Sequence, residues 1–262
     1  MVMNGVPVSG RSSRESRRRA IEQARQREAR RRRQRRLAAW GGAALVLAGA
    51  GTGIGIAVSG GGTASAASAS YAALSTLGDL KASPAPGPLG PEKVPVPGAQ
   101  ALAGTSPATA GQAINGISCN TSEQTLFHVH THLTIFVNGQ QRQVPAAIGI
   151  PSAVVAQGGT GTFAESGACF YWLHTHAADG VIHIESPVKR TFTLGDFFAE
   201  WGQPLGPGQV GPAHGKVTVI VNGQVFTGNP RDVPLGSREN LQVEVGTPLV
   251  APETINWPIT GL

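Results

Sequence analysis

The chain has 262 residues, of which Gly and Pro make up about a fifth and charged residues only 14%. Because Gly- and Pro-rich sequence resists forming a packed core, this composition excludes a single domain built from every residue. Two cysteines exclude a disulfide-dense miniprotein and a four-cysteine zinc site. The pI near 10.0 suggests a nucleic-acid partner only if the basic residues belong to a folded domain.

The positive charge is concentrated at the N-terminus. Residues 1–36 carry 13 Arg and three Glu, a net charge of +10, whereas the other 226 residues carry a net charge of −4. No aromatic residue is interleaved with these arginines for base stacking, so we expect no nucleic-acid partner. This segment is predicted to be a basic cytoplasmic tail, either solvated or lying as a helix on anionic lipid.

An uncharged segment follows the basic tail. Residues 37–59 contain no ionisable side chain and are long enough to span a bilayer as a helix. The preceding arginines place the N-terminus in the cytoplasm and the C-terminal part outside it. We therefore predict a single-pass protein of the cell membrane, with the lipid bilayer as the partner of this segment. The alternative is a secreted protein, cleaved within the small-residue run at 63–70.

A linker is predicted next. Residues 60–112 consist mainly of Gly, Ala, Ser, Thr and Pro, a composition that cannot bury enough apolar surface to fold alone. We expect this segment to hold a distal domain away from the membrane. Within it, residues 71–80 have the pattern of a short helix or of a segment that docks on the domain.

Residues 113–262 are the only part with sustained strand patterning, and they are long enough for one ordinary core. In residues 127–137, most of the odd-numbered residues are apolar, which is typical of a strand with one buried face. Asn138 and Gly139 then predict a tight hairpin turn. The segment HLTIFVNGQ is repeated 84 residues later as KVTVIVNGQ, so a second, related hairpin is expected.

One convincing helix follows the histidine-rich segments. Thr193 is a predicted N-cap with Asp196 at the capping-box position, and Gly202 provides the stop. The order of strand, helix, hairpin and a last strand at 239–245 predicts an α+β, mostly β domain of antiparallel strands with one helix. A β-grasp-like unit fits this order, and a β-sandwich with an inserted helix is the alternative.

Both cysteines fall in the predicted exported domain, where disulfides are favoured. We therefore predict a bridge between Cys119 and Cys169. A blue-copper site at Cys169 is disfavoured, since the only methionines, Met1 and Met3, lie on the predicted cytoplasmic side.

Six of the seven histidines and one acidic residue fall in three strand-like segments: His128, His130 and His132; His174 and His176; and His183 with Glu185. Alternation in a strand places every second side chain on one face, so each segment presents its imidazoles together. If the strands are neighbours, these side chains converge on one patch. Imidazole ligands suit zinc or copper, so we predict a metal site with one of these ions.

The sequence leaves the roles of two side chains undecided. Glu185 is a candidate ligand, a partner that orients an imidazole, or a general base. His214 stands alone in a Gly- and Pro-rich segment, where an ordinary surface role is the simpler interpretation.

The segments SCNTSEQTLFHVHTHLTIFVNGQ, CFYWLHTHAADGVIHIESP and RTFTLGDFFAEWG together resemble a group of bacterial membrane-anchored or secreted proteins with a histidine-rich domain. This resemblance covers about residues 117–202 and implies an exported domain but no particular activity. The spacing of His-x-His with a further His on another strand is also similar to the zinc site of α-type carbonic anhydrases. The HTH segment with a downstream Glu resembles cupins. The chain departs from the carbonic anhydrases in length and surrounding pattern, and from cupins in its glycines.

The leading hypothesis is a membrane-tethered extracytoplasmic protein that binds copper or zinc through the histidine cluster. One alternative is a metalloenzyme with a three-histidine site and Glu185 as base. Another is a non-catalytic envelope adhesion or assembly module, whose histidines form an incidental polar or pH-responsive cluster.

Overall fold

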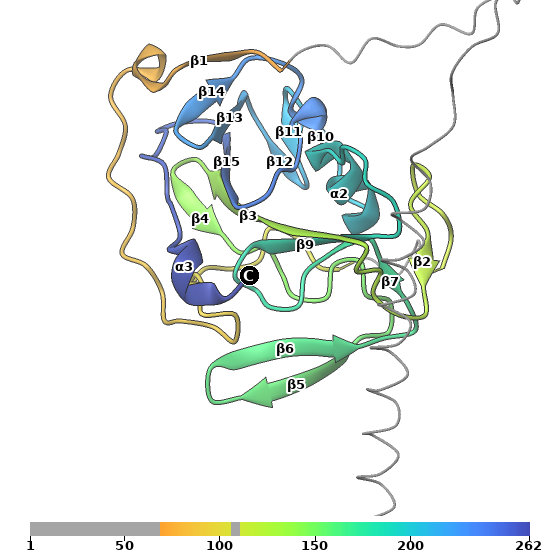
Figure 1. The fold of residues 1–262 in the computed structure, drawn as a ribbon. Helices are drawn as coiled ribbons and strands as arrows, with labels where there is room; N and C mark the ends of the chain where they lie inside the picture. The colour runs from red at the N-terminus through yellow and green to blue at the C-terminus, as the bar shows by residue number, and fades with distance from the viewer. Residues whose placement is uncertain (1–68, 106–110) are drawn as a thin grey trace, which may run out of the picture. The chain divides into compact units, whose positions relative to one another are not determined.

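The computed structural model describes residues 69–105 and 111–262. The predicted cytoplasmic tail (1–36), the predicted transmembrane segment (37–59) and the start of the predicted linker lie outside the described residues. Within the described part, no helix has both the length and the apolar character that crossing a membrane requires. This part is mostly β, with one helix longer than four residues, as the predicted α+β class requires (Figure 1).

The main sheet contains eight strands in the order β1-β14-β13-β15-β3-β9-β8, with β4 also paired to β3. These strands are β1 (Tyr71–Ala73), β3 (Phe127–Val137), β4 (Gln140–Arg142), β8 (Leu173–His174), β9 (Val181–Ser186), β13 (Val217–Val221), β14 (Gln224–Phe226) and β15 (Glu239–Val245). The prediction of antiparallel strands is wrong for one pair, because β15 runs parallel to β3 in the middle of the sheet. Sequence patterns define hairpin partners, but the pairing of β15 with β3 joins segments about a hundred residues apart.

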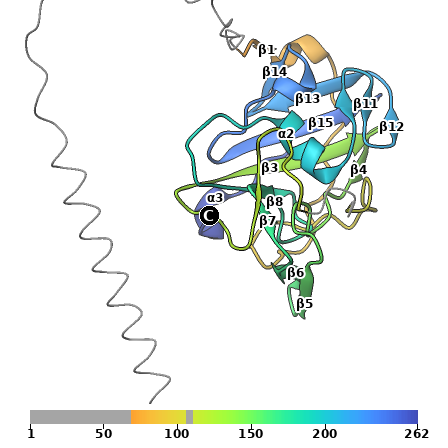
Figure 2. The same cartoon turned by 90° about the vertical axis from the view of Figure 1, so that its right-hand side faces the viewer.

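Smaller elements surround this sheet. Three small sheets are formed by β2 (Cys119–Asn120) with β7 (Phe170–Tyr171), by β5 (Val154–Gly158) with β6 (Gly161–Ser166), and by β10 (Leu205–Gly206), β11 (Gln209–Val210) and β12 (Ala213–His214). The helices of the described residues are η1 (Leu74–Leu77), α2 (Leu194–Trp201), η2 (Pro230–Asp232) and α3 (Trp257–Thr260), of which η1 and η2 are 3₁₀ helices. The β5–β6 hairpin projects from the body of the domain in both views (Figures 1 and 2).

Both predicted hairpins are confirmed. The turn between β3 and β4 places Asn138 at φ 51° and Gly139 at φ 69°, and the turn between β13 and β14 places Asn222 at φ 48° and Gly223 at φ 79°. Two successive residues with positive φ are the mark of the tight hairpin turn that Asn-Gly favours.

Helix α2 is also confirmed at both ends. Thr193 and Asp196 form the reciprocal capping box, and Gly202 ends the helix in the left-handed conformation at φ 69°. Its side chains Phe197 and Phe198 are fully buried in the main core. The helix therefore covers one face of the main sheet.

The two faces of the sheet differ in chemistry because side chains alternate along each strand. From β3, Leu133 and Ile135 enter the core beneath α2, and Ile182 and Ile184 do so from β9. The intervening residues of both strands, including the histidines, point to the opposite face.

Part of the predicted linker lies against the domain. Strand β1 pairs with β14, and Lys81 bridges to Val250. Val94 is fully buried and Leu102 joins the main core. Residues 71–80, predicted to form a short helix or to dock on the domain, contain β1 and η1. A few apolar anchors and backbone hydrogen bonds suffice to fix a Pro-rich segment whose composition alone predicts no fold.

The predicted disulfide is confirmed. Cys119 and Cys169 are bonded, with their Cα atoms 5.4 Å apart and a sequence separation of 50. The bridge lies beside the β2–β7 pair, where Cys119 is opposite Tyr171. It therefore ties the segment before β3 to the segment before β8.

Candidate metal centre

The register of three neighbouring strands brings the histidines together. Strand β9 lies between β3 and β8, and His183 on β9 is directly opposite His130 on β3 and His174 on β8. In the same register His128 is opposite Glu185. Because directly opposed residues in an antiparallel pair have their side chains on the same face, these groups meet on the face away from α2.

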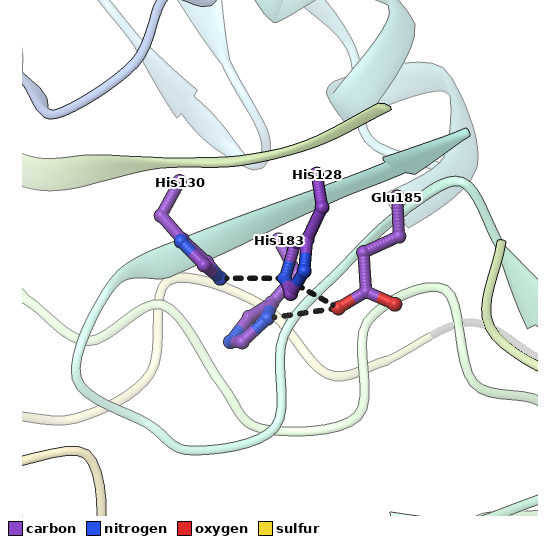
Figure 3. A group of neighbouring side chains, drawn as sticks. All are labelled: His128, His130, His183 and Glu185. Carbon is purple, nitrogen blue, oxygen red and sulfur yellow. Dashed lines mark hydrogen bonds and ion pairs between the residues drawn. The ribbon is translucent and has the colours of Figure 1, made fainter. Parts of the chain in front are cut away.

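The first set of side chains, which we call the open group, consists of His128, His130, His183 and Glu185. Each offers a ligand atom, and these atoms all lie within 4.8 Å of one another. Nε2 of His128 is 3.0 Å from Nε2 of His130 and 3.0 Å from Oε1 of Glu185. Nδ1 of His183 lies 3.4 Å from the same carboxylate oxygen (Figure 3). Three imidazoles and one carboxylate from strands β3 and β9 thus converge on a common point.

The open group is accessible from one side. The side chain of His128 is 40% exposed, whereas the other three are buried. A surface hollow of about 410 Å³ adjoins it, lined by His128, His130, Arg238 and Leu262 among others. An ion or small molecule can therefore approach along His128.

The second set, which we call the inner group, consists of His174, His176, His183 and Glu185, and its ligand atoms also lie within 4.8 Å of one another. Nε2 of His174 is 3.2 Å from Nε2 of His176. Both side chains are buried, and the ring of Phe163 stacks on His176 at 4.8 Å. This group has no exposed histidine comparable with His128.

Two further carboxylates, which the sequence analysis missed, contact the cluster. Oε1 of Glu92 lies 2.6 Å from Nε2 of His183, and Oε1 of Glu123 lies 3.4 Å from Nε2 of His176. Glu92 comes from the docked Pro-rich segment and is buried. The sequence held one signal for it, since Glu92 is the only acidic residue between Asp79 and Glu123.

Burial and neighbouring charges separate the protonation states of these side chains. Burial, with the charges of His183 and His128, lowers the pKa of His130 to about 3. Burial likewise lowers the pKa of His174 well below its ordinary value. These two imidazoles are therefore neutral at pH 7 and carry a lone pair, the form that binds a metal.

His183 behaves in the opposite way. Burial disfavours its charged form, but hydrogen bonds to Glu185 and Glu92, and their charges, outweigh this and raise its pKa to about 9. Burial similarly disfavours the charged form of Glu185, yet the hydrogen bond from His183 and the charge of His128 lower its pKa. The carboxylates thus provide negative charge at the centre of the cluster, where a cation is stabilised.

Two histidines lie outside both groups. His132 hydrogen-bonds through Nε2 to the carbonyl of Asp179 at 2.9 Å, and burial lowers its pKa to about 4. Its side chain shares the face of His130, but its partner on β9 is Val181, which carries no ligand atom. His214, on β12, is exposed. Of the six histidines expected at the site, the structure brings five together.

The donor set fits a transition-metal ion. Imidazole nitrogens and carboxylate oxygens are the ligands of zinc and copper sites. Among the described residues, Oε2 of Glu185 and Oε2 of Glu92 are buried and have no hydrogen-bond partner. Buried polar atoms are nearly always paired, so these oxygens beside an imidazole cluster are compatible with a bound metal ion. Buried His and Glu groups close enough to hold a metal ion are therefore present.

Comparison of the chain with protein-family models, with curated proteins and with solved structures found no match.

Proposed function

We propose that this protein is a membrane-tethered, extracytoplasmic metal-binding protein that holds copper or zinc at the open group. The observation that carries the proposal is the convergence of His128, His130 and His183 with Glu185. Their nitrogen and oxygen atoms are spaced as the ligands of one ion would be. In a tetrahedral site with bonds of 2.0 to 2.1 Å, neighbouring ligand atoms lie about 3.3 Å apart. The two distances of 3.0 Å from Nε2 of His128 are close to this value.

The location belongs to the same proposal and depends on residues outside the described part. The arginines of 1–36 and the uncharged segment 37–59 support a single anchor with the domain outside the cytoplasm. The Cys119–Cys169 disulfide agrees with an oxidising compartment.

The finer fold is proposed on similar grounds. Among the described residues, one main sheet carries α2 on one face, and no second sheet of comparable size packs against it. This arrangement favours the β-grasp-like alternative over a β-sandwich, which needs two packed sheets.

A metalloenzyme is a second candidate, favoured by the hollow beside His128. Three imidazoles would hold a metal ion, and that ion would be the Lewis acid of a catalytic site. Glu185, buried and 3.0 Å from Nε2 of His128, would then be placed to accept a proton from a substrate or water entering the hollow.

Elemental analysis of the full-length protein, purified in detergent without chelators, tests the proposal. We expect copper or zinc in the wild type and its loss when His130→Ala and His183→Ala are combined. The matched control is His214→Ala, which removes an exposed imidazole outside the cluster and should retain the metal. A wild-type protein that contains no metal, and takes up neither ion on titration, would overturn the proposal in favour of an adhesion or assembly module.

A further inference from the structure

The inner group differs from the open group in how its own two histidines are held. Nδ1 of His174 donates a hydrogen bond to the carbonyl of Tyr171 at 2.8 Å, and Nδ1 of His176 donates one to the carbonyl of Ala164 at 2.7 Å. A neutral imidazole has only one N–H group. Each Nδ1 faces a carbonyl oxygen, which only accepts, so Nδ1 carries that N–H group and in the neutral rings each Nε2 carries a lone pair.

These two lone pairs face each other. The Nε2 atoms of His174 and His176 lie 3.2 Å apart, yet neither neutral ring has a proton to share. The separation matches the spacing of about 3.3 Å expected between two ligands of a tetrahedral ion. A backbone carbonyl that fixes the far nitrogen is also the usual means by which proteins orient an imidazole toward a metal.

The surroundings offer the charge that a second ion needs. Glu123 is 3.4 Å from Nε2 of His176, and Glu92 is 2.6 Å from Nε2 of His183. Together with Glu185, these side chains place three carboxylates around the cluster. Three carboxylates carry more negative charge than one dication needs, and they offset most of the charge of two dications.

His183 is suited to serve both groups. Its Nδ1 lies 3.4 Å from Glu185 and its Nε2 lies 2.6 Å from Glu92, so its two nitrogens face different carboxylates. Its ring stacks on that of His174 at 5.4 Å and meets that of His130 edge-on at 4.5 Å.

We infer that the cluster is a two-ion centre, in which the inner group holds a second copper or zinc ion and shares His183 and Glu185 with the open group. Binding of the two ions releases both ring N–H protons of His183 to solvent, and the resulting imidazolate bridges the ions through Nδ1 and Nε2. This inference rests on the proposed function of the open group. The open group, with its exposed histidine, is the site that exchanges its ion, and the buried inner group retains its ion.

Metal stoichiometry tests the inference. The full-length protein in detergent is stripped with a chelator, dialysed and titrated with Zn(II), and the bound zinc is measured by elemental analysis. We expect two ions per wild-type chain, one when His174→Ala and His176→Ala are combined, and two for the control His214→Ala.

The outcomes separate the two claims. One ion in the wild type overturns the two-ion centre but leaves the proposed function standing, whereas no bound ion overturns both. Two ions in the His174→Ala and His176→Ala variant overturn the assignment of the second ion to the inner group.

A second measurement does not depend on any variant folding. With Cu(II) as the probe, two ions that share His183 interact magnetically, so the integrated electron paramagnetic resonance intensity should fall well below two spins per two bound coppers. A full two spins, with no half-field transition, would overturn the sharing of His183.

Discussion

The strand that carries His174 is packed tightly against a glycine, and an added methyl group tests this contact. Gly149 has φ +71°, and a Cβ placed there would lie 2.4 Å from the carbonyl oxygen of Leu173 and 3.0 Å from Cβ of His174. Gly116 has nearly the same backbone, φ +74°, but a Cβ there meets nothing within 4 Å. The two Gly→Ala variants therefore share the backbone strain and differ in the clash.

The expected magnitudes follow from these two contributions. The left-handed conformation costs an alanine about 1 to 2 kcal/mol at either position. At Gly149 the clash with backbone atoms adds about 1 to 3 kcal/mol, typical of an overpacked site. Gly116→Ala should therefore lose about 1 to 2 kcal/mol of unfolding free energy, and Gly149→Ala about 2 to 5 kcal/mol.

Urea unfolding followed by tryptophan fluorescence measures both losses. With a slope of about 2 kcal/mol per molar, the midpoint should fall by about 0.5 to 1 M for Gly116→Ala and by about 1 to 2.5 M for Gly149→Ala. Because β8 must move, Gly149→Ala should also weaken zinc binding at the inner group, and Gly116→Ala should not. Equal midpoints for the two variants would refute the packing of residue 149 against β8.

Three more perturbations test the bridge, a buried carboxyl and a helix cap. Replacing Cys119 and Cys169 together with Ser should cost about 4 kcal/mol on the chain-entropy treatment of a loop of 50 residues; a loss below 1 kcal/mol in urea unfolding would contradict it. Burial, with the charge of Asp196, raises the pKa of Glu200 well above 4.5. Above pH 4.5 the folded state therefore keeps a proton that the unfolded chain releases. The free energy of unfolding consequently falls as the pH rises above 4.5. Glu200→Gln should remove this decline. At pH 8 it should raise the free energy of unfolding by about 1.4 kcal/mol for each unit by which the pKa differs between the folded and unfolded states. An equal change in stability at pH 4 and pH 8 would exclude a titrating carboxyl group. Thr193→Ala should cost about 1 kcal/mol by removing the N-cap, and thermal unfolding would show no change if the capping box were unimportant.

The features that the sequence predicted are those decided by near neighbours. The turn at Asn138 and Gly139 needs only two residues that tolerate positive φ, and the cap of α2 needs only Thr193 and Asp196. The alternation of β3 likewise depends on one strand. In each case the physical cause lies within a few residues, so the pattern and the structure agree.

The features that were missed depend on which distant segments meet. The parallel pairing of β15 with β3 leaves no local signature, because either direction suits a buried alternating strand. His132 lies outside the open and inner groups for the same reason. Parity assigns it to the face of His130, but its role depends on the residue opposite it, Val181, which only the register with β9 reveals.

The docked segment has a consequence for how the domain is defined. Composition suggests a domain that begins at residue 113, yet Glu92 and β1 both precede that point and both contact the rest of the fold. A fragment of residues 113–262 would lose the carboxylate 2.6 Å from His183, and with it one of the charges that offset the desolvation of a buried cation. It would also uncover the edge of β14. Metal affinity measured on such a fragment would therefore underestimate that of the whole chain, and the difference would report what the Pro-rich segment contributes to the centre.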